Sequence, residues 1–394
     1  MGDIQLYFGW RTALLLMLSV QMLALACVLS TTDVNRKANR LLAVFLLVAT
    51  GVVTPYTIGF AGFYDAWKGL TYAPLALPLF LAPLLYGYTH ALIEGTAPAR
   101  WRWHLAPGFT QLAYLTLAFL LPFDTKMAWA DSVAASWISR AFSIGVLLGL
   151  IAYSAAALKL LQRFRTGLAD LRSDDERYAA RWLGRILAAM LVTTALWAGW
   201  QGWQTLSGFN YFEFFGLHMA IGMIGVLLGV EGWRHASLQF GRKLVPVQQT
   251  DAEEARTASV AEPDWHAIAA DYAGRTRDAE WWREPDLSLP RLARYLGTNT
   301  GRLSRAINTG LGVNFSAFVN GLRAEAVARV LTGHPGADLL DLAFEMGFAS
   351  KASFNRAFLA RYGMAPSRYR QEARAHVSDH DFVPAAPDLR RADT

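Results

Sequence analysis

The chain has 394 residues, enough for two or three domains, and 54% of them are hydrophobic. Its mean hydropathy of +0.22 is high for a water-soluble protein, and its net charge of +6 is too small to identify a polyanion partner by itself. Cys27 is the single cysteine, which excludes an internal disulfide framework and a metal cluster built on cysteines. The apolar run around Cys27 has no clearly basic segment before it, so we do not expect a removed signal peptide.

Long apolar runs alternate with short polar breaks from the N-terminus to about residue 233. A helix needs about 20 mostly apolar residues to cross a membrane. Few polar residues recur at helical spacing in these runs, which disfavours a soluble helical bundle. We therefore predict an all-α chain with a seven-helix transmembrane bundle in residues 1–240. The expected spans lie near residues 10–30, 40–60, 70–93, 104–122, 137–161, 182–206 and 213–233.

Basic residues gather in the breaks after the first, third, fifth and seventh predicted spans, and the alternate breaks hold only Lys68 and Lys126. Short loops rich in Lys and Arg stay on the cytoplasmic side. We therefore expect a multi-pass protein of a bacterial inner (cytoplasmic) membrane, with the N-terminus outside and residues 234–394 in the cytoplasm. The basic residues are Arg36, Lys37, Arg40, Arg100, Arg102, Lys159, Arg163, Arg165, Arg172, Arg177, Arg181, Arg185, Arg234, Arg242 and Lys243.

Prolines and glycines mark special positions in the predicted bundle. Pro74, Pro78 and Pro83 each remove a helix hydrogen bond, so we expect a kink in the third span. A packing role explains this kink more readily than a sensor hinge. The string Gly-Val-Leu-Leu-Gly occurs at 145–149 and again at 225–229, and this spacing predicts close approach of neighbouring helices.

Polar side chains at membrane depth are candidates for function. His218 and Glu213 could serve a ligand or a proton, and an interhelical or interfacial hydrogen bond explains them equally well. His90, Glu94 and His104 could form a metal site, but a position at the membrane interface needs no extra assumption. We therefore predict no catalytic residue and no metal site here.

Trp197, Trp200 and Trp203 recur at intervals of three residues near the outer end of the sixth span. They fit an interfacial aromatic belt better than a ligand cage. The sequence contains no glycine-rich phosphate loop, nucleophile elbow or zinc-peptidase motif. We predict that the chain is not an enzyme and needs no cofactor.

Residues 241–284 are predicted to form a linker followed by a short amphipathic helix. The segment 241–285 holds nine acidic and six basic residues, a net charge of −3. Trp265, Ile268, Ala269 and Tyr272 recur at helical spacing. The sequence leaves open whether this helix pairs with a second chain or packs on the module that follows.

The segment from Leu287 to residue 331 predicts a helix-turn-helix and a longer third helix. Ser288 can cap a helix that begins at Leu289, and Gly297 begins a turn. Asn299 or Thr300 can cap a second helix over 301–308. The third helix is expected over about 316–331.

A second helix-turn-helix is predicted over residues 338–371. Asp338 can cap its first helix, Gly347 lies in the turn, and Ser350 can cap its second helix. Phe354 and Phe358 lie four residues apart and are expected in the core, as is Phe348.

The two units joined by one helix resemble the DNA-binding domain of the AraC/XylS family of transcription regulators. The match covers residues 285–371, within a predicted domain of 285–374, and 375–394 is expected to be a flexible tail. Residues 286–374 hold twelve basic and six acidic residues, a net charge of +6. The most specific part of the match is Gly347-Phe348-Ala349-Ser350, Ser353-Phe354, Arg356, Phe358, Gly363, Pro366-Ser367 and Tyr369-Arg370.

The resemblance implies two recognition helices that enter successive major grooves on one face of the duplex. Gly301 stands where other members often have a larger base-contacting side chain, so Thr300 and Arg302 are expected to compensate. Arg356 could contact a base or serve the structure. The candidate DNA-binding residues are Thr300, Gly301, Arg302, Ser304, Arg305, Lys351, Ser353, Asn355 and Arg356.

The leading hypothesis is a membrane-embedded one-component transcription regulator. Its partners would be double-stranded promoter DNA, the lipid bilayer and an envelope or membrane ligand, and a homodimer is left open. One alternative is a transporter or membrane enzyme with a DNA-binding domain that regulates its own synthesis. Another is a bundle that only anchors the DNA-binding domain at the membrane.

Overall fold

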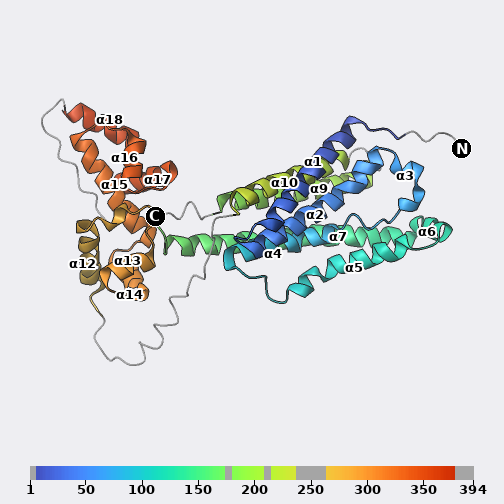
Figure 1. Cartoon of the computed structure of the whole chain (residues 1–394), viewed down its shortest axis with the longest axis horizontal. Helices are drawn as coiled ribbons and strands as arrows, with labels where there is room; N and C mark the ends of the chain where they lie inside the picture. Colours follow the sequence, from blue (N-terminus) through green and yellow to red (C-terminus); the bar gives the residue numbers. More distant parts are fainter. Residues whose placement is uncertain (1–5, 174–179, 208–213, 237–262, 378–394) are drawn as a thin grey trace, which may run out of the picture. The chain divides into compact units, whose positions relative to one another are not determined.

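The structure is a computed structural model that describes residues 6–173, 180–207, 214–236 and 263–377 (Figure 1). The regular secondary structure within these ranges is helical, which confirms the all-α prediction. The chain divides into two compact units, the first of residues 1–162 and 180–243 and the second of residues 163–179 and 244–394. Glu213, much of the predicted linker and most of the predicted tail lie outside the described residues.

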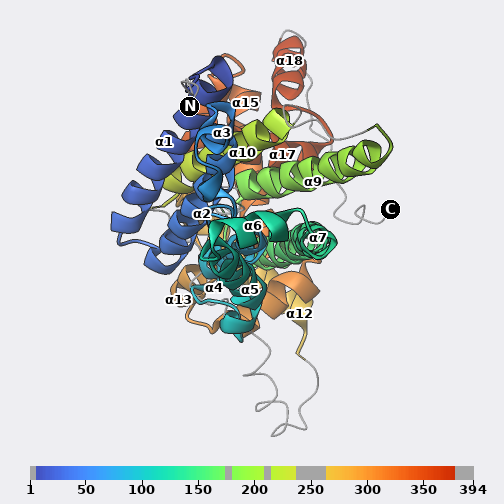
Figure 2. The same cartoon turned by 90° about the vertical axis from the view of Figure 1, so that its right-hand side faces the viewer.

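The first unit contains five helices that are long and apolar enough to cross a membrane, namely α1, α2, α7, α9 and α10. Figures 1 and 2 show α1, α2 and α10 side by side. The elements are α1 (Trp10–Thr31), α2 (Arg36–Phe60), α3 (Phe63–Ala66), η1 (Lys68–Leu70), η2 (Pro78–Phe80), α4 (Leu81–Glu94), α5 (Trp101–Phe119), α6 (Phe123–Ala130), α7 (Val133–Ala169), α9 (Arg181–Ser207) and α10 (Phe215–Arg234). The last turns of α7, from Arg163 onward, belong to the second unit.

The third predicted span is a continuous helix only from Leu81. Its 14 residues rise about 21 Å at 1.5 Å each, less than the roughly 30 Å of a bilayer core. Pro74 and Pro78 precede the helix, and Pro83 lies in its first turn, where a backbone N–H has no helical partner to lose. The predicted kink was therefore wrong, because these prolines delay the start of α4. The fourth predicted span coincides with α5, which is not among the five apolar helices.

The chain from residue 71 to 80, which precedes α4, packs closely against α2 and α5. A Cβ atom at Gly51 of α2 would lie 2.5 Å from the carbonyl oxygen of Leu75, so only glycine permits this approach. The backbone N–H of Leu79 donates to Oε1 of the buried Gln111 on α5, at 3.3 Å. A backbone donor without a helical partner needs another acceptor in a membrane. Gln111 supplies that acceptor.

The two Gly-Val-Leu-Leu-Gly strings behave differently. At Gly225 and Gly229 of α10, a Cβ atom would lie 2.5 Å from Met22 Sδ and 2.9 Å from Leu25 Cδ1 of α1. The predicted close approach is therefore confirmed for this copy. At Gly145 the nearest atom would be a methyl group of Leu79 at 3.3 Å, which is a looser contact.

The second unit has one hydrophobic core to which all of its longer helices contribute. The amphipathic segment forms α12, which packs against the π-helical turn η5. The contact is close, since Trp265 O and Ala269 Cβ occupy the space that a Cβ atom at Gly310 would fill. Helix α12 therefore packs on the C-terminal module. The elements are α12 (Trp265–Asp278), η4 (Trp281–Arg283), α13 (Leu289–Leu296), α14 (Thr300–Arg305), η5 (Ala306–Gly310), α15 (Phe315–Gly333), α16 (Leu339–Glu345), α17 (Lys351–Tyr362) and α18 (Pro366–Val377).

The close approach at Gly51 gives a testable prediction for the first unit. Gly51→Ala should destabilise the chain by about 1–3 kcal/mol, because the new methyl group meets backbone that cannot rotate away. Gly199→Ala on α9 is the matched control, since nothing lies within 4 Å of that position. Thermal unfolding of both variants in lipid nanodiscs checks this. Equal melting temperatures for the two variants would contradict the packing described for residues 71–80.

Candidate nucleic-acid interface

The first helix-turn-helix consists of α13, a turn and α14. Gly297 ends α13 with φ of +69°, a left-handed conformation that suits glycine. Asn299, and not Thr300, caps α14, because its Oδ1 accepts from the N–H of Arg302 at 2.7 Å. Ser288 occupies the N-cap position of α13 as predicted, but its hydroxyl makes no cap hydrogen bond. The helix after the turn is shorter than the predicted 301–308, since η5 follows it from Ala306.

The outer face of α14 presents Arg302 and Arg305, which are both exposed. Thr300, Gly301 and Ser304 are half-buried on the same helix. The Arg305 guanidinium lies 5.5 Å from the centre of the Trp265 ring, a cation–π contact with α12. Helix α12 thus contacts one of the two exposed arginines of α14.

The second unit begins with a well-capped helix. Asp338 caps α16 by accepting from the N–H groups of Leu340 at 2.8 Å and Asp341 at 3.0 Å. The backbone N–H groups of Asp341 and Leu340 lower the pKa of the Asp338 carboxyl from its ordinary value. Ser350 caps α17 by accepting from the N–H of Ser353 at 3.1 Å. Both caps were predicted and are confirmed.

Gly347 fixes the turn between α16 and α17. Its φ is +87°, and the space where a Cβ atom would lie is occupied by the carbonyl of Arg283 in η4. The N–H of Phe348 donates to the carbonyl of Ala343 at 3.0 Å, which closes the end of α16. Glycine is required here both for the conformation and for the approach of η4.

The exposed face of α17 carries Lys351, Asn355 and Arg356. The prediction that Ser353 shares this face was wrong, because Ser353 is only 5% exposed. Its hydroxyl donates to the carbonyl of Ser350 at 2.8 Å and so belongs to the helix cap. A serine three residues after a capping serine turns toward the cap, which the spacing of exposed positions alone did not reveal.

An aromatic cluster packs against the buried side of α17. The ring centres of Phe348 and Phe354 are 5.3 Å apart, and those of Phe354 and Phe358 are 5.7 Å apart. Phe358 meets Tyr369 of α18 edge-on at 5.3 Å. The three phenylalanines are buried, as predicted. The most specific part of the sequence match thus includes side chains that hold α17 and α18 together.

Arg323 of α15 is fully buried, and sequence reasoning missed it. Its Nε donates to the carbonyl of Trp282 at 2.7 Å, and its guanidinium also donates to the carbonyl of Glu284 and to Oδ1 of Asn320. A further bond at 3.2 Å goes to the hydroxyl of Ser173. This network holds η4 against α15. A single arginine on an apolar helix gave no signal for this role.

Residues 171–173 form a strap, a short segment after α7 that is hydrogen-bonded to the C-terminal module. The N–H of Leu289, at the start of α13, donates to the carbonyl of Leu171 at 2.9 Å. Ser173 donates to the carbonyl of Leu287 through its N–H at 3.2 Å and its hydroxyl at 2.9 Å. Its own carbonyl accepts from Nδ2 of Asn320 at 2.9 Å. These bonds join segments 114 to 150 residues apart, so no local pattern could predict them.

The described residues contain no group of three or more His, Cys, Asp or Glu side chains placed to hold a metal ion. His90 Nδ1 instead lies 2.7 Å from the carbonyl of Thr96, and His104 Nδ1 lies 2.8 Å from the Tyr153 hydroxyl. These two histidines therefore make separate hydrogen bonds.

Comparison with known proteins agrees with this geometry. Residues 292–372 match the family described as "Helix-turn-helix domain". An uncharacterised HTH-type transcriptional regulator of Staphylococcus aureus (strain COL) is 37% identical over 102 residues, which are 25% of this chain and 14% of that protein. The HTH-type transcriptional regulator MtrA of Neisseria gonorrhoeae is 28% identical over 89 residues, 23% of this chain and 29% of that protein. No solved structure matches.

The chain therefore spans less than a third of the length of either relative. The likeness covers the C-terminal module and supports DNA-binding regulation for it. It says nothing about the first unit.

The turn at Gly347 gives the first prediction for this module. Gly347→Ala should cost about 3 kcal/mol or more, from the left-handed conformation together with the clash against Arg283. Gly363→Ala is the control, because Gly363 also has a positive φ, of +68°, but nothing lies within 4 Å of it. That variant should lose only about 1–2 kcal/mol. Hydrogen exchange of the α16–α17 amides in the full chain measures both effects, and similar losses would argue against the contact with η4.

The strap gives the second prediction for this module. Ser173→Ala should weaken the module by about 1–3 kcal/mol, because one N–H of a buried guanidinium loses its acceptor. Thr166→Ala removes an exposed hydroxyl on α7 that bonds only within its own helix, and it should change little. The readout is hydrogen exchange at Leu287 and Leu289. Unchanged protection in Ser173→Ala would mean that the Ser173 hydroxyl contributes nothing to the fold of the module.

Proposed function

We propose that the chain is a membrane-embedded one-component transcription regulator. The helix-turn-helix domain, which also occurs in HTH-type transcriptional regulators, supports the DNA-binding part of this proposal. Five apolar helices in the first unit support the membrane part. The observation that carries the proposal is the pair of side-chain-capped helices α14 and α17, each of which exposes basic side chains.

The recognition helices would enter successive major grooves on one face of promoter DNA, about 34 Å apart. Arginine binds guanine edges in a bidentate manner and asparagine binds adenine, so Arg302, Arg305 and Asn355 are the proposed base readers. Lys351 would bind a phosphate, and Arg356 a phosphate or a base. Thr300, Gly301 and Ser304 would let the backbone of α14 come close to the duplex. Ser353 is left out because it is buried.

The proposed location is the bacterial inner membrane, with the C-terminal module in the cytoplasm. An odd number of spans carries the chain from an outside N-terminus to an inside C-terminus. Both the seven predicted spans and the five helices that are long and apolar enough to cross a membrane are odd in number. Promoter DNA would then bind at the membrane surface. Two chains bound to adjacent sites would form a homodimer on DNA.

The proposed route for a signal is α7. This helix of 37 residues contains one of the five candidate spans, and its last turns lead into the strap that bonds to α13 and α15. A change in the membrane unit that moves α7 would alter the pull on Ser173, and with it the packing under both recognition helices. This arrangement favours a sensing role over simple anchoring.

The test is the discrimination between target and random DNA. Arg305→Ala combined with Asn355→Ala should reduce preference for the duplex that the wild-type chain selects from a random pool by at least about tenfold, since each lost base contact is worth roughly 1–3 kcal/mol. Arg368→Ala, whose side chain pairs with Glu372 on α18, is the control and should keep the preference. If the double variant discriminates as the wild type does, the assigned recognition faces are wrong.

The same titrations should show a strong salt dependence. The logarithm of the binding constant should fall with the logarithm of the salt concentration by about 0.9 per phosphate neutralised. Lys351→Ala should lower that slope by about one unit while leaving sequence preference intact. An unchanged slope would remove Lys351 from the proposed phosphate contacts.

A further inference from the structure

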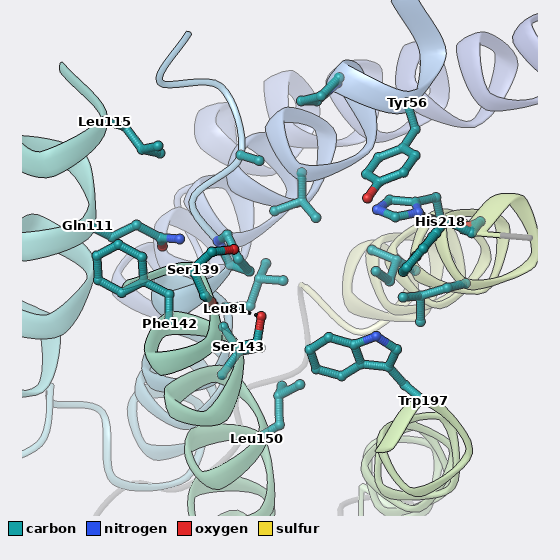
Figure 3. Close-up of a pocket in the computed structure, with 18 of the residues that line it drawn as sticks. Tyr56, Leu81, Gln111, Leu115, Ser139, Phe142, Ser143, Leu150, Trp197 and His218 are labelled. Atoms are coloured by element: carbon teal, nitrogen blue, oxygen red, sulfur yellow. Dashed lines mark hydrogen bonds between the residues drawn. The ribbon is translucent and has the colours of Figure 1, made fainter. Parts of the chain in front are cut away.

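A cavity of about 790 Å³ lies in the first unit (Figure 3). Its walls come mainly from α2, α5, α7, α9, α10 and the chain before α4, with single residues from α3, α4 and α6. The volume falls within the range of roughly 300–1,000 Å³ that is typical of small-molecule sites. Every residue that lines it belongs to the first unit.

Among the residues that the structure describes, the lining carries no Asp, Glu, Lys or Arg. Its polar groups are hydroxyls, one amide, one indole and one imidazole, set among aromatic and aliphatic side chains. A charged molecule placed there would lose its hydration without gaining a counter-charge, which is costly. The composition of the wall therefore selects a neutral ligand.

Trp197 supplies a hydrogen-bond donor to the cavity. Its Nε1 is buried and has no hydrogen-bond partner among the described residues, and its indole forms part of the cavity wall (Figure 3). A buried donor without an acceptor costs about 1–3 kcal/mol. An acceptor on a bound molecule, such as a carbonyl or ether oxygen, would satisfy it.

His218 lines the wall beside Tyr56, and the two rings stack with their centres 3.5 Å apart (Figure 3). Its Nδ1 lies 2.9 Å from the carbonyl of Phe214. A carbonyl only accepts, so Nδ1 is the donor in this bond. The stacked pair gives the cavity a flat aromatic surface.

The chain before α4 forms another wall, through Tyr72, Ala73, Ala76 and Pro78. Non-helical backbone at membrane depth occurs where it is buried in protein or lines a cavity. Hydrophobic segments interrupted by proline are also found at ligand sites within membranes. The break in the third predicted span is thus a second observation, independent of Trp197, that indicates a site here.

We propose that this cavity binds a neutral, membrane-partitioning molecule with a flat apolar body and a hydrogen-bond acceptor that bonds to Trp197. This ligand would be the signal of the proposed regulator, and that consequence rests on the proposed function. Ser139 and Ser143 of α7 line the cavity, and α7 leads into the strap. Occupancy would therefore act on the helix that reaches the DNA-binding module.

The probe is a benzophenone that carries a dodecyl chain, which is neutral, flat and photoreactive and has a carbonyl acceptor. The full chain in lipid nanodiscs is illuminated with it, and labelled residues are mapped by mass spectrometry. Labels should concentrate on cavity residues such as Tyr56, Phe142 and Leu217. A neutral dodecyl-substituted phenyl compound that has the carbonyl acceptor but is not photoreactive should compete for the site. The 4-dodecylbenzoate anion, which is charged, should not compete.

Variants test the assigned acceptor. Trp197→Phe should weaken saturable labelling about fivefold, the effect of one neutral hydrogen bond. Trp200→Phe, on the same helix but outside the lining, should label as the wild type does. Ser143→Leu fills the opposite wall and should also reduce labelling, so the test does not depend on one tryptophan. Equal labelling of Trp197→Phe and Trp200→Phe, or labels confined to outward residues of α1, would overturn the proposal.

The outcome is separable from that of the proposed function. If cavity labelling fails while the Arg305 and Asn355 substitutions lower DNA discrimination, the regulator stands and the ligand site falls. If labelling succeeds and no sequence-specific DNA binding is found, the cavity remains a ligand site in a protein of another function.

Discussion

The DNA-binding module depends on the hydrogen bonds made by the buried guanidinium of Arg323. A cation removed from water costs several kcal/mol unless its N–H groups find acceptors. Here the acceptors include the carbonyls of Trp282 and Glu284 and the hydroxyl of Ser173. Satisfying the charge therefore fixes η4, and η4 places the carbonyl of Arg283 against Gly347. The direction in which α17 leaves its turn is thus set from the centre of α15.

The strap also bonds to the same guanidinium. Ser173, in the segment that follows α7 and belongs to the second unit, accepts a hydrogen bond from Arg323. The strap makes five hydrogen bonds to the module, and at a net contribution of about 1 kcal/mol each they are together worth about 5 kcal/mol. Residues 171–173 are thus a firmly held part of the module's fold.

Local rules predicted much of the module. Asp338 and Ser350 cap as expected, and Asn299 is the one of two candidates, Asn299 and Thr300, that caps α14. Ser288 holds the expected N-cap position without a side-chain hydrogen bond. The same rules failed where long-range packing decides. Ser353 was assigned to the outer face by its residue type, but the cap draws its hydroxyl inward. Arg323 was not singled out, because nothing near it in the sequence reveals its bonds to Trp282, Glu284 and Ser173, which lie 39 to 150 residues away.

The first unit shows the same limit on a larger scale. The apolar runs predicted seven spans, but only five of the described helices are long and apolar enough to cross a membrane, because hydropathy does not ask whether a backbone can be helical. Pro74 and Pro78 prevent a regular helix over residues 71–80. The backbone N–H and C=O groups of this segment therefore need hydrogen-bond partners from elsewhere in the protein. Oε1 of Gln111 accepts from the N–H of Leu79, and the absence of a side chain at Gly51 leaves space for the carbonyl of Leu75. A chain that accepts such a break within an apolar segment gains a wall of irregular shape, which a straight helix cannot provide. For this reason we regard the break as the origin of the cavity.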